Sequence, residues 1–132
     1  MFKLTIITPS GLYLEEEVSS LTLKLVTGYR TILSGHLPLI GALDYAPMHF
    51  YKDDKKHIFS LSGGALNVKD DGSVTIITNA IESKEFIDIS RAISAKERAE
   101  ARLNNKDPNI DTKRAELALL RAISRIKTYE SE

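Results

Sequence analysis

Arg121 and Arg125 stand four residues apart near the end of this 132-residue chain. On a helix, residues at that spacing project from one side, so both guanidinium groups can reach one ligand. Guanidinium groups bind phosphate through paired, charge-assisted hydrogen bonds, and Arg91 can approach the same group from an earlier helical segment. The spacing therefore indicates a phosphate site. A second interpretation needs no ligand: Asp88 caps a helix and the arginines face solvent or pair with acidic residues of the helices, namely Glu97, Glu100 and Glu116.

The other residues that could do chemistry lack the partners that chemistry needs. The histidines, His36, His49 and His57, have no His-x-x-x-His spacing and no paired carboxylates, so neither a metal site nor acid/base catalysis is expected. We interpret His36 as a turn residue. The Ser62-Gly63-Gly64 segment lacks the Gly-x-Ser-x-Gly elbow of hydrolases, and there is no phosphate-binding loop ending in Gly-Lys-Ser/Thr. No catalytic residue is therefore predicted.

Composition limits the class of protein. Apolar residues make up 42% and charged residues 27%, which is typical of soluble globular proteins, and no run approaches the roughly 20 apolar residues that span a bilayer. The first residues predict a strand rather than a signal peptide, which favours the cytoplasm. Eighteen basic and eighteen acidic residues balance, which argues against nucleic acid as the main partner. Cysteine is absent, so disulfides and thiol chemistry are excluded.

Short β-type runs fill the first two thirds of the chain and are separated by Gly, Pro and Asp turn signals, including Asp53-Asp54 and Gly63-Gly64. Leu21, Leu23 and Leu25 alternate with polar residues, as in a strand with one buried side. The pattern predicts a β-sandwich or flattened barrel. The runs cover residues 3–8, 13–16, 20–26, 29–33, 48–51, 56–61, 65–69 and 74–78.

From Asp88 onward the apolar spacing becomes helical. Asp88 is predicted to cap a first helix that ends near Leu103, and residues 104–108 break it. Asp107 or Asn109 is predicted to cap the second helix, with Pro108 in its first turn. The apolar stripe of that helix is thin and alanine-rich, so we expect an antiparallel helical hairpin that can move. The stripe consists of Ala115, Leu119, Ala122, Ile123 and Ile126.

Three segments together carry a resemblance to a known family, and they occur in the family's order. They read Ile-Leu-Ser-Gly-His-Leu-Pro-Leu-Ile at residues 32–40, Ser-Gly-Gly-Ala-Leu-Asn-Val at 62–68, and Ile-Asp-Ile-Ser-Arg-Ala at 87–92 followed by Ala-Lys-Glu-Arg-Ala-Glu at 95–100. Over its full length the chain resembles the epsilon subunit of bacterial F-type ATP synthases.

The resemblance implies a fold and a role. The fold is a ten-stranded β-sandwich or flattened barrel over residues 1–84, followed by a two-helix hairpin over 85–132. The role is that of a non-catalytic central-stalk subunit at the cytoplasmic face of the cell membrane, which meets the membrane only through the complex. Its sandwich would dock on the gamma subunit and the c-ring. Its hairpin would extend toward the alpha and beta subunits and inhibit ATP hydrolysis.

The resemblance also implies a regulatory ATP, although no cofactor is required and no metal site is expected. In many such subunits the Ile-Asp-x-x-Arg-Ala motif and arginines of the second helix bind ATP. The matching residues here are Glu82, which would contact the base, together with Ile87, Asp88, Arg91, Ala92, Arg121 and Arg125.

Two departures from the family pattern fall in predicted loops. Residues 27–31 replace a longer turn, and residues 44–47 replace a stretch that usually has a glycine turn. They leave open how closely the rotor contacts follow those of other members. Two alternatives also stay open: a free-standing ATP-sensing protein of the same architecture, and a small β-sandwich hydrolase.

Overall fold

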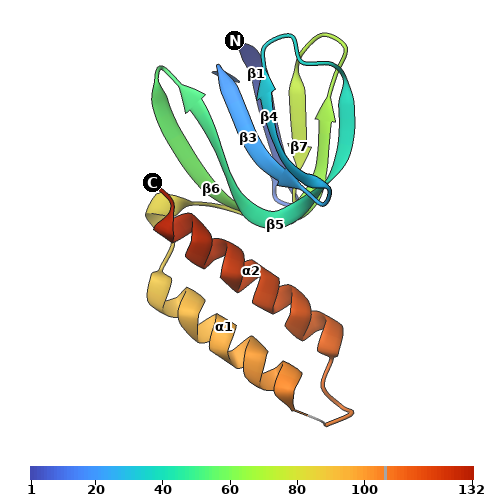
Figure 1. Ribbon diagram of the computed structural model, residues 1–132, viewed down its shortest axis with the longest axis vertical. Coiled ribbons are helices and arrows are strands. Elements are labelled where there is room, and N and C mark those ends of the chain that lie inside the picture. Colours follow the sequence, from blue (N-terminus) through green and yellow to red (C-terminus); the bar gives the residue numbers. More distant parts are fainter. Residues whose placement is uncertain (106) are drawn as a thin grey trace.

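Eight strands precede a short 3-10 turn and two helices in this computed structural model, which describes residues 1–105 and 107–132 (Figure 1). Lys106, part of the predicted helix break, lies outside the described residues. The elements are β1 (Phe2–Thr8), β2 (Gly11–Val18), β3 (Ser20–Leu25), β4 (Gly28–Leu33), β5 (Leu39–Lys52), β6 (Lys55–Val68), β7 (Val74–Ile77), β8 (Ile81–Ser83), η1 (Lys84–Phe86), α1 (Ile89–Asn104) and α2 (Thr112–Glu130).

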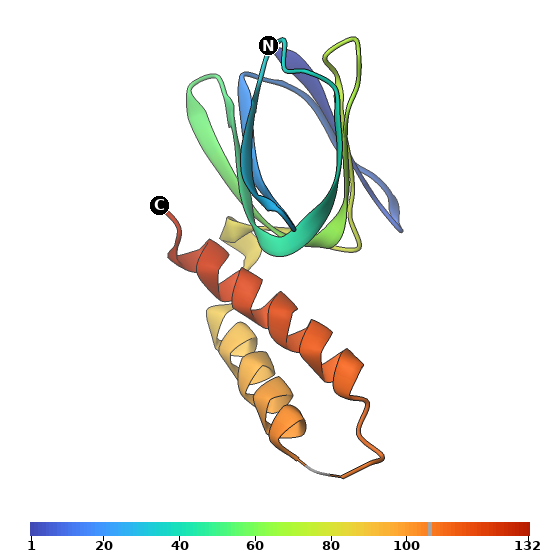
Figure 2. The same ribbon diagram turned by 45° about the vertical axis from the view of Figure 1, so that its right-hand side comes forward.

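The strands form one sheet folded into two layers around a common interior (Figure 2). Their order is β2-β1-β7-β6-β5-β3-β4, with β8 added to β6, and only β1 and β7 pair in parallel among the described strands. The end strands β2 and β4 do not pair with each other in the part of the chain that the structure describes. The predicted sandwich is therefore present, but the prediction of a flattened barrel is wrong because the sheet is open.

The prediction of ten strands is also wrong, since the described residues form eight. The reason is that β5 and β6 are each 14 residues long and bend without a break. In β5 the burial pattern shifts between Leu43 and Ala46, so the strand changes the face that it buries. Residues 44–47, predicted as a loop, lie inside this strand. A bend with a shifted register preserves most ladder hydrogen bonds, so the chain need not leave the sheet.

Gly63-Gly64, predicted as a turn, lies inside β6 instead. Both residues have positive φ, +72° and +123°. A Cβ on Gly64 would lie 1.9 Å from the carbonyl oxygen of Ile77, so only glycine allows the two strands to approach here. The predicted turn at Asp53-Asp54 is confirmed: φ is positive at both residues, as in the two-residue hairpin turns that match strand twist.

The predicted β runs over residues 20–26 and 29–33 are confirmed as β3 and β4. Leu25 pairs with Gly28, so Val26 and Thr27 form the connection, and most of the stretch 27–31 that departs from the family pattern lies in β4.

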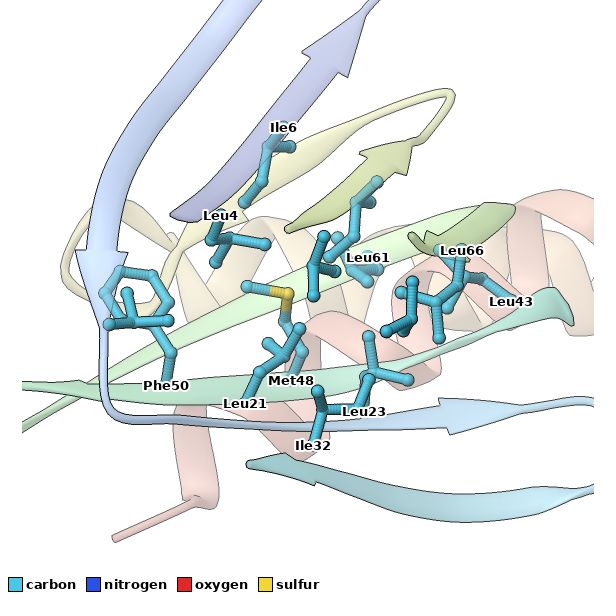
Figure 3. Packing of buried hydrophobic residues seen from close by; sticks show 14 of the residues in the cluster. Leu4, Ile6, Leu21, Leu23, Ile32, Leu43, Met48, Phe50, Leu61 and Leu66 are labelled. Atoms are coloured by element: carbon cyan, nitrogen blue, oxygen red, sulfur yellow. The ribbon is translucent and has the colours of Figure 1, made fainter. Parts of the chain in front are cut away.

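The core lies between the two layers and is built by strand residues alone (Figure 3). Leu21, Leu23 and Leu25 are all buried in it, which confirms the predicted alternation along β3. Leu4 and Ile6 enter from β1, and Met48 enters from β5. Because no helical residue belongs to this cluster, the sandwich has a complete core of its own.

The two helices lie beyond one end of the sandwich, with α2 between the strands and α1 (Figures 1 and 2). They run antiparallel, as predicted, and α2 contacts β5 and β6. Their facing surfaces bury small residues, namely Ala92, Ala99, Ala115 and Ala122. Leu119, Ile123 and Ile126 are only half-buried. No described helix is both long enough and apolar enough to cross a lipid bilayer.

The caps of the helices differ in how well they were predicted. Asp88 caps α1 as expected, accepting a hydrogen bond from the Arg91 backbone at 3.2 Å. The prediction that Asp107 or Asn109 caps α2 is wrong, because Asp111 is the cap and accepts from the Arg114 backbone at 3.0 Å. Asp107 instead forms a local turn with Asn109, at 2.9 Å, so the residues around Pro108 precede the helix.

Candidate functional site

A cavity of about 280 Å³ lies where α1 and α2 meet the sandwich. Its lining combines three guanidinium groups with one carboxylate and small side chains. The lining residues are Ser60, Ser62, Ala80, Ile81, Glu82, Arg91, Arg121 and Arg125. Three arginines around one cavity leave a net positive charge, which suits an anionic ligand.

Each charged residue is held by a separate element. Glu82 lies on β8 and pairs in register with Ser60 on β6. Arg91 lies in the first turn of α1, where the Asp88 cap fixes the helix start. Arg121 and Arg125 lie one turn apart on α2, as their spacing predicts. The cavity therefore exists only while α2 rests against the sandwich.

An ion pair joins α2 to the sandwich at this cavity. Arg125 donates from Nε to Oε1 of Glu82 at 3.1 Å, and the two side chains are 23% and 36% exposed. Arg91 and Arg121 are more exposed. The negative charge of Glu82 also acts on Tyr13, whose pKa is raised first by burial and then by this carboxylate.

The contact of α2 with the sandwich beside the cavity is polar. The buried hydroxyls of Ser60 and Ser124 lie 2.8 Å apart, and Ser124 is also 3.4 Å from the carbonyl oxygen of Leu61. Thr128, fully buried, donates to the Ser124 carbonyl at 2.7 Å. Each neutral hydrogen bond of this kind contributes only about 0.5–1.5 kcal/mol net to the attachment of α2.

The structure brings four of the seven predicted site residues to the cavity: Glu82, Arg91, Arg121 and Arg125. Asp88 caps α1, while Ile87 and Ala92 are buried and do not line the cavity. Their role in binding a nucleotide stays a prediction.

Sequence reasoning missed the floor of the cavity, Ser60, Ser62, Ala80 and Ile81. The available signal was alternation along β6: Phe59 and Leu61 point to the core, so Ser60 and Ser62 must point outward. The contribution of Ala80 and Ile81 depends on β8, whose three residues are too few to show a strand pattern.

Comparisons with known proteins cover both parts of the chain. Residues 1–84 match the family model described as ATP synthase, Delta/Epsilon chain, beta-sandwich domain, and residues 85–130 match its long alpha-helix domain. The ATP synthase epsilon chain of Bacillus velezensis is 39% identical over 124 residues, which cover 94% of this chain and 93% of that one. The epsilon chain of Halalkalibacterium halodurans is 42% identical over 122 residues, covering 92% and 91%. This chain belongs to the ATP synthase epsilon-chain family.

Chains in two solved ATP synthase structures resemble this chain in fold. A chain of the Euglena gracilis mitochondrial ATP synthase, in a structure of its OSCP/F1/c-ring, is 27% identical with a TM-score of 0.83, over 93% of this chain and 78% of that one. A chain from the central stalk/c-ring of the Tetrahymena thermophila enzyme shares the fold at 17% identity, with a TM-score of 0.60 over 98% and 93%. As an epsilon chain, the protein is a non-catalytic homologue of the central-stalk subunit.

Proposed function

We propose that this epsilon chain transmits rotation in the central stalk of an F-type ATP synthase and restrains ATP hydrolysis through a detachable, ATP-binding hairpin. The observation that carries the proposal is the match of both modules, strands and helices, to one family over nearly the whole chain. Within the complex the chain would lie peripherally at the cytoplasmic face of the cell membrane. Its sandwich, residues 1–84, would dock on the gamma subunit and the c-ring.

An exposed apolar row across the sandwich supports the docking role. Side chains of five neighbouring strands pair in register on the outer side of one layer: Leu12, Ile7, Ile77, Ala65 and Ala42. Leu12 and Ile77 are 64% and 55% exposed. A continuous apolar patch on a sheet is costly to leave in water and marks an interaction surface. We assign this apolar row to gamma, because the helices lie against a different part of the sheet.

The way in which α2 is attached supports the restraining role. The sandwich has its own core without helical residues, and α2 is joined to it beside the cavity by the Ser60–Ser124 hydrogen bond and the Glu82–Arg125 ion pair. Detaching α2 exposes little of the main core, so the hairpin can leave while the sandwich stays folded. An extended hairpin would then reach the alpha and beta subunits.

The charges around the cavity support the nucleotide role. Arg91, Arg121 and Arg125 converge on the cavity and can share the phosphate groups of ATP, while Glu82 is near enough to receive the base. Asp88, Ile87 and Ala92 would support the first turn of α1 behind the site. Since the arginines come from both helices and the acid from β8, ATP would favour the docked hairpin over the extended one.

Purification of the full-length chain with an affinity tag from its own cells tests the proposal. We expect gamma, the c-ring subunit, alpha and beta to co-purify. Recovery of the chain alone, still binding ATP, would instead support the free-standing ATP sensor of the same architecture.

A further inference from the structure

Arg125 has a protein partner inside the proposed nucleotide site. Its Nε donates to Oε1 of Glu82, and the two residues belong to different elements, α2 and β8. Glu82 is the single carboxylate among the described residues that line the cavity. The pair therefore neutralises one of the three guanidinium groups at the place where phosphate would bind.

A carboxylate and a phosphate compete for a guanidinium group because both bind it through charge-assisted hydrogen bonds to oxygen. A carboxylate beside bound phosphates also repels them, and the repulsion is screened less in a partly buried site than at the open surface. With side-chain exposures of 23% and 36%, Arg125 and Glu82 form such a partly buried site.

We propose that Glu82 is a built-in competitor for the phosphate groups of the ligand, so that nucleotide binding exchanges one anion on Arg125 for another. The proposal rests on the nucleotide site proposed above. Without nucleotide, the Glu82–Arg125 pair joins α2 to the sandwich. With nucleotide, the phosphates take over Arg125 and the released carboxylate is free to accept a hydrogen bond from the amino group of the base.

Two other roles for Glu82 predict different effects of charge removal. If Glu82 only orients Arg125, glutamine should serve nearly as well, because its side-chain oxygen still accepts a hydrogen bond from the guanidinium. If Glu82 only contacts the base, its replacement should weaken the binding of ATP and leave the binding of a ligand without a base unchanged. Competition alone predicts that Glu82→Gln binds a base-free polyphosphate more tightly.

The test is calorimetry of the full chain with inorganic tripolyphosphate, without magnesium, for the unchanged protein, Glu82→Gln and Glu85→Gln. Glu85 is exposed, lies three positions away and does not line the cavity, so its variant removes the same charge without the contact. We expect Glu82→Gln to bind tripolyphosphate roughly tenfold more tightly, since the neutral amide competes for Arg125 more weakly than the carboxylate does and does not repel the phosphates. Glu85→Gln should change the affinity less than about twofold.

Unchanged or weaker tripolyphosphate binding by a folded Glu82→Gln chain would contradict the proposed competition without contradicting the proposed nucleotide site. If neither ATP nor tripolyphosphate binds the unchanged chain, the proposal of a nucleotide site is itself wrong.

A second measurement uses the unchanged chain and does not depend on how the variant folds. The Nε–H signal of Arg125 in a nuclear magnetic resonance spectrum, assigned by its loss in Arg125→Lys, should shift as tripolyphosphate replaces Glu82. A signal that stays fixed while the ligand saturates the protein contradicts the exchange.

Discussion

Ser60 on β6 and Ser124 on α2 share a buried hydrogen bond, with their Oγ atoms 2.8 Å apart. It is a direct side-chain link between the helical hairpin and the sandwich, and it lies beside the arginine cavity. Ser124 has a second acceptor within reach, the Leu61 carbonyl oxygen at 3.4 Å. The two serines are therefore not equivalent, and the difference can be measured.

Ser124→Ala should weaken the docking of α2 by about 1–3 kcal/mol, because the Ser60 hydroxyl then stays buried without this partner. Ser60→Ala should weaken the docking less, since the Ser124 hydroxyl can still donate to the Leu61 carbonyl oxygen. In the double variant the loss of docking free energy should be smaller than the sum of the two single losses. Hydrogen exchange of the α2 amides measures the docking. Ser94→Ala, exposed on α1, reports the helix-propensity change alone. Additive effects in the double variant would mean that the two hydroxyls do not interact.

Ser60→Cys/Ser124→Cys should lock the hairpin against the sandwich. The two side chains face each other with their Oγ atoms 2.8 Å apart, so sulfur atoms at these positions can meet, and the unchanged chain contains no cysteine that could mispair. If the extended hairpin restrains the enzyme, the oxidised variant should give a synthase complex with faster ATP hydrolysis that slows after reduction. Each single cysteine variant serves as the control. Equal rates in the oxidised and reduced double variant would show that hairpin extension is not the brake.

Much of the site could be predicted because its residues follow local rules. The spacing of Arg121 and Arg125 places them on one side of α2, and an aspartate before a helical pattern predicts the cap at Asp88. The partner of Arg125 could not be predicted from local rules. Glu82 reaches it only through the docking of α2 on β8, a tertiary contact between residues 43 positions apart. No local pattern encodes that contact.

The fold shows the same division. Alternation predicted the buried face of β3, and the pair Asp53-Asp54 predicted the turn between β5 and β6. Both features depend only on neighbouring residues. Gly63-Gly64 looked like a turn since glycine tolerates positive φ, and the φ values are indeed positive. What the local sequence does not reveal is that β7 approaches Gly64 so closely that glycine is needed inside a strand. The predicted runs at 56–61 and 65–69 therefore belong to one strand, β6.

Deleting the chain from Asp88 onward should leave a folded sandwich that still assembles, because the core cluster contains strand residues only. ATP hydrolysis by the complex should rise if the hairpin is the brake. Circular dichroism of the truncated chain and hydrolysis by the reconstituted complex measure the two effects. If the deletion leaves the rate of ATP hydrolysis unchanged, the proposal that the hairpin restrains hydrolysis is wrong.

Arg125→Ala should weaken ATP binding about tenfold or more, since hydrogen bonds to charged groups are worth ~1.5–3 kcal/mol each. Arg102→Ala, exposed on α1 and outside the cavity lining, should bind ATP as the unchanged chain does. Calorimetry with magnesium-free ATP compares them. An equal loss in both variants would mean that general charge, rather than the cavity, attracts the nucleotide.

The central claim, that this chain docks in the stalk through its sandwich, is tested most directly by binding of the full-length chain to purified gamma subunit. Ile77→Glu places a charge in the middle of the apolar row and should weaken binding about tenfold or more, because an apolar side chain is worth ~1.5–3 kcal/mol when buried. Leu33→Glu is the matched control, since Leu33 is 57% exposed, close to the 55% of Ile77, but lies on β4 outside the row. We expect tight binding by the unchanged chain and by Leu33→Glu, and loss by Ile77→Glu. No binding of the unchanged, folded chain to gamma would contradict the account, and equal binding by both variants would contradict the assignment of the row.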